Sequence, residues 1–195
     1  MKIYTKIGDQ GKTTFFGCGL IQKNDPRIEA FGALDELNYI IGVTLCFVED
    51  EKLRQTLLKV QNDLFQVGAD LAGSNLQHNK LPRITEEHVT ELELAIDELD
   101  AKLGIPQKFI LPNGTVASCF LHLTRTMTRR AERSLVAVKD TLNLNPTMLI
   151  YVNRLSDFLY MLARDANNEL HVREQQPMYK YFPEENVEKE EKKEE

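Results

Sequence analysis

Apolar residues recur at helical spacing in five separate stretches of this 195-residue chain, and this periodicity limits its fold more than any other feature. The clearest stretch begins after Thr85, a typical N-cap residue, and ends at Gly104, a typical stop signal. Its apolar positions alternate in steps of three and four: Val89, Leu92, Ile96, Leu99 and Leu103.

The other four stretches predict helices at about 27–48, 51–73, 115–138 and 145–170. Asn145 and Pro146 suit the N-cap and first position of the last helix. The apolar stripe expected on the first helix consists of Ile28, Phe31, Leu34, Leu37, Ile41, Leu45 and Val48. Long helices with short connections and no alternating strand pattern predict an all-α, antiparallel five-helix bundle.

Composition and length indicate one soluble domain with a real core, because 42% of the residues are apolar and 28% are charged. The net charge is -6, but residues 184–195 hold seven Glu and three Lys, or -4, which leaves about -2 for the rest. A nearly neutral body argues against general nucleic-acid binding. We expect an N-terminal loop (1–26), a helical bundle domain (27–170) and a C-terminal extension (171–195) with a mobile acidic tail.

The cysteines and the hydropathy of the sequence indicate in which cellular compartment the protein is expected. Cys18, Cys46 and Cys119 are odd in number and form no C-x-x-C pair, so the sequence suggests neither a disulfide framework nor a thiolate zinc site. The N-terminus lacks the apolar stretch of a signal peptide, and runs such as 148–152 are far shorter than the roughly 18 residues that span a bilayer. We expect a cytoplasmic protein with no membrane partner.

The N-terminal run 5–14 contains Gly-Lys-Thr but is not a Walker A motif. Gly8 and Gly11 are separated by two residues instead of four, and no helix pattern follows Thr14. A glycine-rich loop with exposed amides, lysines and threonines suits a polyphosphate. A glycine-rich hairpin without any ligand explains the same residues equally well.

The predicted fourth helix carries an arginine face, which we define as Arg125, Arg129, Glu132 and Arg133. These residues fall within about 100° of one another on a helix of 3.6 residues per turn, opposite the apolar positions. Arginines one turn apart can grip phosphate oxygens, and a carboxylate among them can orient one or approach a metal that the phosphates hold. A solvated basic face balanced by Glu132 is the alternative interpretation.

The fifth helix repeats the pattern, since Asn153, Asp157, Tyr160 and Arg164 share one side. Polar faces on two helices could meet at one site, and Asp35 on the first helix offers an anchor for an arginine. Without a ligand, all of these are ordinary outer-face residues.

The loop between the third and fourth helices holds Phe109 in an apolar run that ends in a Pro-Asn-Gly turn. Phe109 could tuck into the bundle, or it could be presented to a flat apolar ligand, and the residues alone do not decide. The Glu-x-x-His pairs of a di-iron bundle are missing, and no two histidines share a helical ligand spacing. A metal is therefore expected to arrive with a nucleotide.

Five motifs together resemble the PduO-type ATP:cob(I)alamin adenosyltransferases, from Lys2 to about Leu170. The motifs are IYTKIGDQGKTT at 3–14, LDELN at 34–38, FILP at 109–112, RTMTRRAER at 125–133 and YVNRLSD at 151–157. The resemblance implies a ferritin-like five-helix bundle that assembles as a homotrimer, with ATP and cobalamin bound at the subunit interfaces.

Site residues follow from the same resemblance. The positions that match the family's ATP-wrapping segment are Thr5, Lys6, Gly8, Thr13, Thr14 and Lys23. Those that match its helical ATP contacts are Arg129, Arg130, Glu132, Arg133 and Asn153. ATP is implied to carry Mg²⁺ on its phosphates, near Glu132.

The corrinoid half of the site is implied by fewer residues. Arg125 and Asp35 match a salt-bridged pair between neighbouring subunits, and Phe109 matches the aromatic below the corrin. Tyr160 stands near the lower corrin face where the family more often has Phe, and Asn113 stands where Gly is usual. With Arg129, the catalytic group is implied to be Arg125, Arg129, Asp35 and Phe109.

The implied reaction is attack of cob(I)alamin on C5′ of ATP, which forms adenosylcobalamin and releases triphosphate. Phe109 is implied to displace the lower axial ligand, while Arg125, Arg129 and the loop amides stabilise the departing triphosphate. A non-catalytic ATP and cobalamin sensor or carrier would use the same contacts and stays open as an alternative. A reductase and an adenosylcobalamin-dependent enzyme are implied partners that the sequence does not identify.

Overall fold

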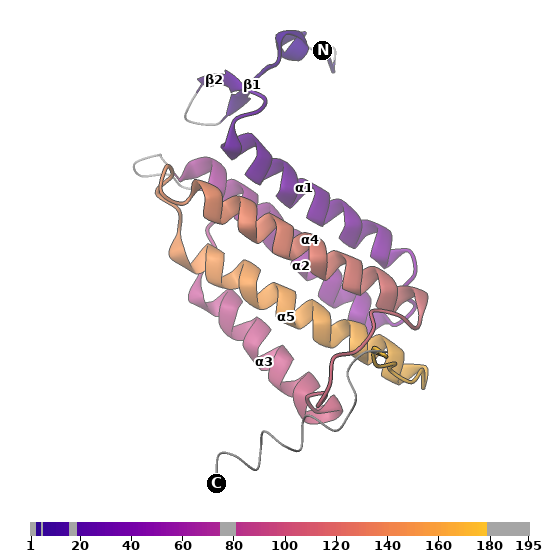
Figure 1. The fold of residues 1–195 in the computed structure, drawn as a ribbon. Helices are drawn as coiled ribbons and strands as arrows, with labels where there is room; N and C mark the ends of the chain where they lie inside the picture. The colour runs from indigo at the N-terminus through magenta and orange to yellow at the C-terminus, as the bar shows by residue number, and fades with distance from the viewer. Residues whose placement is uncertain (1–2, 5, 16–18, 75–80, 179–195) are drawn as a thin grey trace, which may run out of the picture.

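Helices account for nearly all regular structure in the computed structural model, which describes residues 3–4, 6–15, 19–74 and 81–178. Those residues contain α1 Pro26–Leu45, α2 Glu51–Gly73, α3 Glu86–Leu103, α4 Val116–Val138 and α5 Pro146–Glu169 (Figure 1). The predicted five-helix, all-α architecture is confirmed. The predicted bounds of α2 and α3 are reproduced, whereas α1 ends at Leu45 instead of about 48.

Capping side chains explain where the helices begin. Asp25, Asp50, Thr115 and Asn145 each accept a hydrogen bond from a backbone N–H in the first turn of α1, α2, α4 and α5. The predicted N-cap at Asn145 is confirmed. These caps set where the four helices begin, and the apolar stripe of each helix decides which side faces the core.

The core lies where α4 packs on both α1 and α5, with α3 covering α5 and α2 covering α1. Helices α1 and α4 are antiparallel: Thr44 near the end of α1 lies 3.1 Å, Oγ1 to Oγ1, from Thr124 in the first half of α4, whereas Glu29 near the start of α1 pairs with Arg130 in the second half of α4. Phe31 is a correction to the predicted stripe, because it is 36% exposed at the edge of a groove instead of buried. No helix within the described ranges is both long and apolar enough to cross a membrane.

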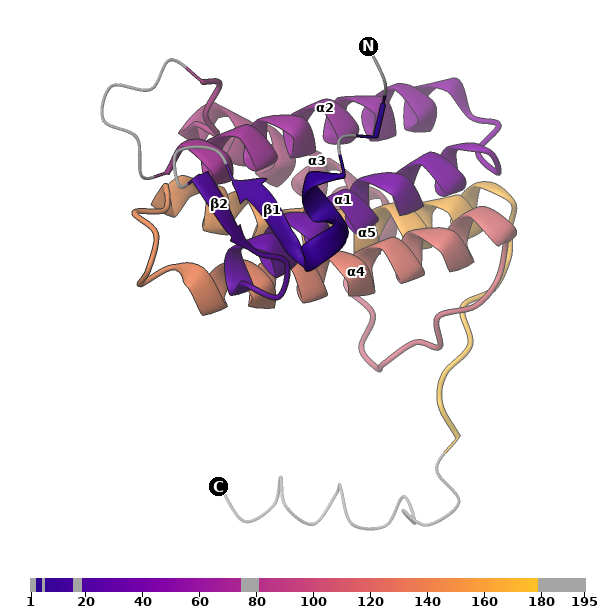
Figure 2. The ribbon, with the colours of Figure 1, turned by 90° about the horizontal axis from the view of Figure 1, so that it is seen from above.

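Residues before α1 form a short 3-10 turn, η1 Ile7–Gln10, and an antiparallel hairpin of β1 Lys12–Phe15 and β2 Gly19–Gln22. Figures 1 and 2 both place this hairpin at the N-terminal end of α1. Phe15 is buried, and the Arg27 guanidinium lies 6.0 Å from its ring centre. This contact anchors the hairpin to the first turn of α1.

A polar network that is buried at Asp63 and Tyr151 and reaches the surface at Lys59 and Glu91 joins α2, α3 and α5. The Tyr151 hydroxyl donates a hydrogen bond to Asp63 over 3.0 Å, and the Lys59 ammonium lies 2.9 Å from Asp63 and 2.8 Å from Glu91. Tyr151 is fully buried, and burial raises the pKa of its hydroxyl well above the ordinary value. The hydroxyl therefore stays protonated and keeps donating to Asp63.

Tyr151→Phe should lower the free energy of unfolding by about 1–3 kcal/mol, because a buried carboxylate loses one of its donors. Chemical denaturation followed by circular dichroism measures this loss. Tyr39→Phe is the matched control, since Tyr39 is exposed on α1. Equal unfolding midpoints for Tyr151→Phe and the wild-type protein would show that the network adds no stability.

Candidate functional site

The arginine face lies on the side of α4 away from the core, as the helical phase predicted. Arg129 and Arg133 are exposed, and neither has a hydrogen bond or ion pair among the described residues. Arg125 is half-buried with its guanidinium 5.4 Å from the centre of the Tyr160 ring. Its buried Nε has no hydrogen-bond partner in the described part of the chain. Guanidinium N–H groups on this face are therefore available to bind a ligand.

The polar faces of α4 and α5 do meet, as the sequence suggested they could. Asn153 donates from Nδ2 to Glu132 over 2.9 Å, and its Oδ1 accepts from Arg154 over 3.2 Å. Arg154 is held in turn by Glu93 of α3, 2.9 Å away. Both the amide and the carboxylate are therefore oriented before any ligand arrives.

Arg130 differs from its neighbours on α4. Its guanidinium pairs with Glu36 over 2.8 Å and with Glu29 over 3.3 Å, both on α1 of the same chain. Its charge is already balanced by two carboxylates, in contrast to the charges of Arg129 and Arg133.

The N-terminal residues form a compact turn over the hairpin. Lys6 has a left-handed backbone with φ of 62°, and the Lys23 ammonium lies so close to Gly8 that a Cβ there would be 3.0 Å from Nζ. Thr13 and Thr14 are neighbours on β1, where Thr13 is half-buried and Thr14 is exposed. Thr5 lies outside the described residues. The hairpin interpretation is confirmed as a conformation, and it leaves the side chains of this turn open to a ligand.

Phe109 is presented to solvent. It is 81% exposed on the loop between α3 and α4, so the interpretation that it tucks into the bundle is wrong. In the same loop Ile105 is also largely exposed. Two large apolar side chains exposed on one loop offer a surface that a ligand or another subunit can cover, so this loop is a candidate binding element.

Behind the arginine face lies a second group of polar side chains. Tyr160 is half-buried between Arg125 and Arg164, whose guanidinium is 5.9 Å from its ring, and burial raises the pKa of the Tyr160 hydroxyl. His122 lies 6.1 Å from the same ring. Burial, with help from the positive charge of Arg125, lowers the pKa of His122 below its ordinary value, which favours a neutral imidazole.

Arg164 corrects a second expectation, because it is 6% exposed and not an outer-face residue. It bonds to Glu174 and to the Gly104 carbonyl. Sequence reasoning also missed His122. Helical periodicity places Arg164 on the polar side of α5 and gives His122 no role, because the partners that give each residue its role lie on other elements.

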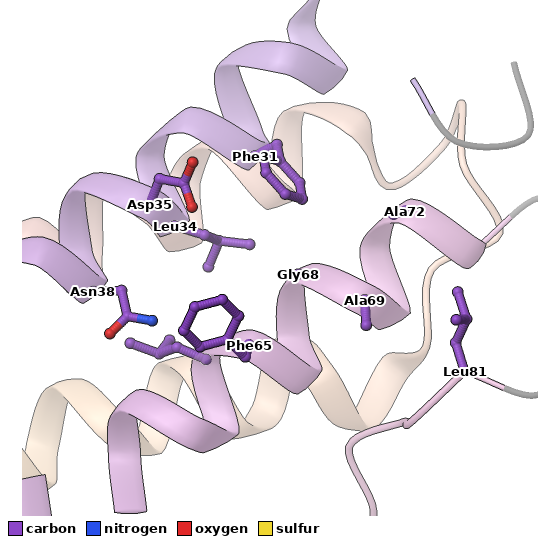
Figure 3. Close-up of a pocket in the computed structure, with 10 residues that line it drawn as sticks. Phe31, Leu34, Asp35, Asn38, Phe65, Gly68, Ala69, Ala72 and Leu81 are labelled. Carbon is purple, nitrogen blue, oxygen red and sulfur yellow. The ribbon is translucent and has the colours of Figure 1, made fainter. Parts of the chain in front are cut away.

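Asp35 is exposed on α1, beside a groove of about 360 Å³ between α1 and α2. Figure 3 shows it at the edge of the groove with Phe31, Asn38, Phe65 and Gly68. Within one chain, no ion pair joins Asp35 to Arg125 among the described residues. The groove is mostly apolar apart from Asp35 and Asn38.

Among the described residues, no three His, Cys, Asp or Glu side chains cluster as a metal site would require. The chemistry available is instead that of free guanidinium groups beside an oriented amide and carboxylate, with a glycine-rich turn and an exposed aromatic on flanking segments. Such a set of groups defines a helical-bundle protein with a site suited to phosphates.

The chain belongs to the cobalamin adenosyltransferase family, whose model matches residues 3–166. It is 41% identical over 172 residues to the corrinoid adenosyltransferase PduO of Salmonella typhimurium, covering 88% of this chain and 51% of that protein. It is 42% identical over 171 residues to the corrinoid adenosyltransferase of Bacillus subtilis, covering 86% and 87%. The chain thus spans about half the length of the first relative and most of the second.

Solved structures give the same grouping. A variant of a PduO-type ATP:corrinoid adenosyltransferase from Lactobacillus reuteri, complexed with cobalamin and ATP, superposes with a TM-score of 0.86 at 36% identity. The match covers 91% of this chain and all of that chain. A second variant from the same organism, complexed with ATP, gives a TM-score of 0.84 at 37% identity.

Arg129→Ala should weaken ATP binding more than Arg130→Ala does, because Arg130 is already paired with Glu29 and Glu36. Loss of a charged phosphate contact costs roughly 1.5–3 kcal/mol, or about 10- to 150-fold in affinity. Isothermal titration with Mg²⁺-ATP measures the difference, and Lys139→Ala at the end of α4 is the control. Equal losses for Arg129→Ala and Arg130→Ala would contradict this division.

Proposed function

We propose that this chain transfers the 5′-deoxyadenosyl group of ATP to a reduced corrinoid, with release of triphosphate. The observation that carries the proposal is that the guanidinium groups of Arg129 and Arg133, which have no partner among the described residues, lie beside the oriented Glu132 and Asn153. Family membership and the cobalamin and ATP complexes of the structural relatives support the same reaction.

ATP would lie along the arginine face. Arg125 and Arg133 are eight residues apart, about 12 Å along a helix axis, which is long enough to follow an extended nucleotide. Because α1 and α4 are antiparallel, Arg133 lies toward the N-terminal hairpin and Arg125 toward the Phe109 loop. We therefore assign the far phosphates of the triphosphate to Arg129, Arg133 and the hairpin, and the adenosyl group with its adjoining phosphate to the end near Arg125.

The N-terminal turn would close over the triphosphate. The backbone amides near Gly8 and the side chains of Lys6, Lys23, Thr13 and Thr14 supply donors, with Thr5 assigned from the resemblance alone. Asn153 holds one oxygen of Glu132, which leaves the other free to orient a phosphate-bound Mg²⁺ or its water. With no protein cluster for a metal in the described part of the chain, Mg²⁺ would be carried by the phosphates.

The reduced corrinoid is a substrate that supplies its own nucleophile, cobalt(I), so no protein base is required for attack at C5′. The protein has to position the two reactants and to stabilise the charge on the leaving triphosphate. Arg129 and the loop amides serve the second task. Phe109, exposed on its loop, serves the first by covering the lower face of the corrin in place of an axial ligand.

We also propose that the site is completed by a second copy within a homotrimer. Asp35 has no ion pair within its own chain among the described residues, and the buried Nε of Arg125 has no partner there either. A salt bridge between Asp35 of one subunit and the guanidinium of Arg125 of the next would balance both charges. It would also place the apolar groove beside Asp35 against the neighbouring subunit.

An anaerobic assay tests the reaction itself. Purified protein is mixed with Mg²⁺-ATP and chemically reduced cobalamin, and the visible spectrum is followed for the cobalt–carbon product while triphosphate is quantified. Equal amounts of adenosylcobalamin and triphosphate are expected. Tight binding of both substrates without product would contradict the enzymatic proposal and leave the carrier alternative.

Phe109→Ala should lose the spectral signature of four-coordinate cob(II)alamin and most turnover while binding ATP nearly as well as the wild-type protein. The reason is that only the lower corrin face loses its cover. Ile105→Ala is the matched control, because Ile105 is similarly exposed on the same loop. If Phe109→Ala keeps both the spectrum and the rate, the assignment of Phe109 fails.

ATP should protect the N-terminal turn from hydrogen exchange. The amides of residues 7–15 should exchange more slowly with Mg²⁺-ATP than without it, because the exposed turn gains phosphate contacts. Mass spectrometry of peptides from this segment measures the change, with α3 as an internal reference. Identical exchange with and without ATP would contradict a wrapping role.

A further inference from the structure

The Phe109 loop, residues 104–115, is held at both of its ends by side chains of α5. At its start, the Gly104 carbonyl accepts a hydrogen bond from Nη1 of Arg164 over 2.6 Å. At its end, Asn167 donates from Nδ2 to the Asn113 carbonyl and accepts from the Thr115 N–H, both over 2.9 Å. Arg164 and Asn167 are one helical turn apart, so one face of α5 fixes both ends.

Asn167 is 3% exposed and fits its position closely. Gly114 has φ of 120°, and a Cβ there would lie 2.2 Å from Oδ1 of Asn167. Only glycine leaves room for the amide at this point. Because Thr115 is the N-cap of α4, the same amide also ties the loop to the first turn of the helix that carries the arginine face.

A second layer of contacts comes from the C-terminal segment, residues 171–178. Arg164 pairs through Nε with Glu174 over 2.8 Å. The next residue, Gln175, accepts the Leu111 N–H on its carbonyl over 2.7 Å, and its side chain accepts from Asn113 over 3.1 Å. Figure 1 shows this segment and the Phe109 loop at the same end of the bundle. The contact at Leu111 lies two residues from Phe109.

These contacts form a clamp, which we define as Arg164, Asn167, Glu174 and Gln175. We infer that the clamp positions Phe109 for the corrinoid half of the reaction, an inference that rests on the proposed function. The loop contains no helix or strand, and Phe109 is exposed, so burial of its own side chain does not fix its position. Arg164 and Asn167 are positioning residues: they act through the loop and do not touch the substrate.

Asn167→Ala tests the clamp. Faster hydrogen exchange at the amides of Leu111 and Thr115 is expected, together with loss of most four-coordinate cob(II)alamin and a drop in turnover of about 10- to 100-fold. The affinity for Mg²⁺-ATP should stay within about twofold of wild type, because the arginine face is unchanged. Asn145→Ala is the matched control: it removes an amide that bonds to Asp70 and Ile84 but lies at the other end of α5.

Glu174→Ala provides a second variant that leaves the helical core intact, since Glu174 lies after α5. It should reproduce the spectral loss in weaker form. Both substitutions are then repeated in the Phe109→Ala background. If the clamp acts only through Phe109, neither one should lower turnover further there.

Three outcomes would overturn the inference. Unchanged exchange at Leu111 and Thr115 in Asn167→Ala would show that no clamp operates. Asn167→Ala could instead show faster exchange but a normal cob(II)alamin spectrum and normal turnover, while Phe109→Ala is impaired. That result would show that the clamp does not serve Phe109, and the proposed function would still stand. A Phe109→Ala protein with wild-type spectrum and rate would overturn the role of Phe109 and the inference together.

Discussion

The burial of one side of α4 is the constraint on which the rest of the molecule depends. Its apolar and small residues pack between α1 and α5, so the stripe half a turn away has to face outward. That outward stripe holds the arginine face. The hydrophobic packing therefore sets the orientation of the guanidinium groups, and the hydrogen bond from Asn153 to Glu132 orients the carboxylate among them.

Helix α4 carries exposed positive charges that the negative net charge of the whole chain does not reveal. The chain carries -6 overall, yet α4 presents Arg129 and Arg133 without partners among the described residues. Arg130 is balanced by Glu29 and Glu36 of α1. Arg130 is thus paired within the chain, whereas Arg129 and Arg133 stay available for the triphosphate that we propose as their ligand.

Helix positions could be predicted from the sequence because they depend on local signals. The caps at Thr115 and Asn145 and the apolar periodicity placed four of the five helices within about two residues of their observed bounds. Side-chain partners could not be predicted, since they depend on residues far apart in the chain. Arg130 meets Glu29 across 101 positions, and Arg164 meets Gly104 across 60. The exposure of Phe109 likewise depends on how its loop is held, which composition does not show.

The central claim is that one chain forms an incomplete site and that Asp35 of one copy meets Arg125 of another. Its most direct test mixes two charge-reversed variants, Asp35→Arg and Arg125→Asp, each expected to be inactive alone. After unfolding and refolding together, mixed assemblies contain matched Asp–Arg pairs at their mixed interfaces, so adenosylcobalamin formation should return. If the mixture stays inactive while a chain carrying both reversals is active, the two residues meet within one chain and the shared site is wrong.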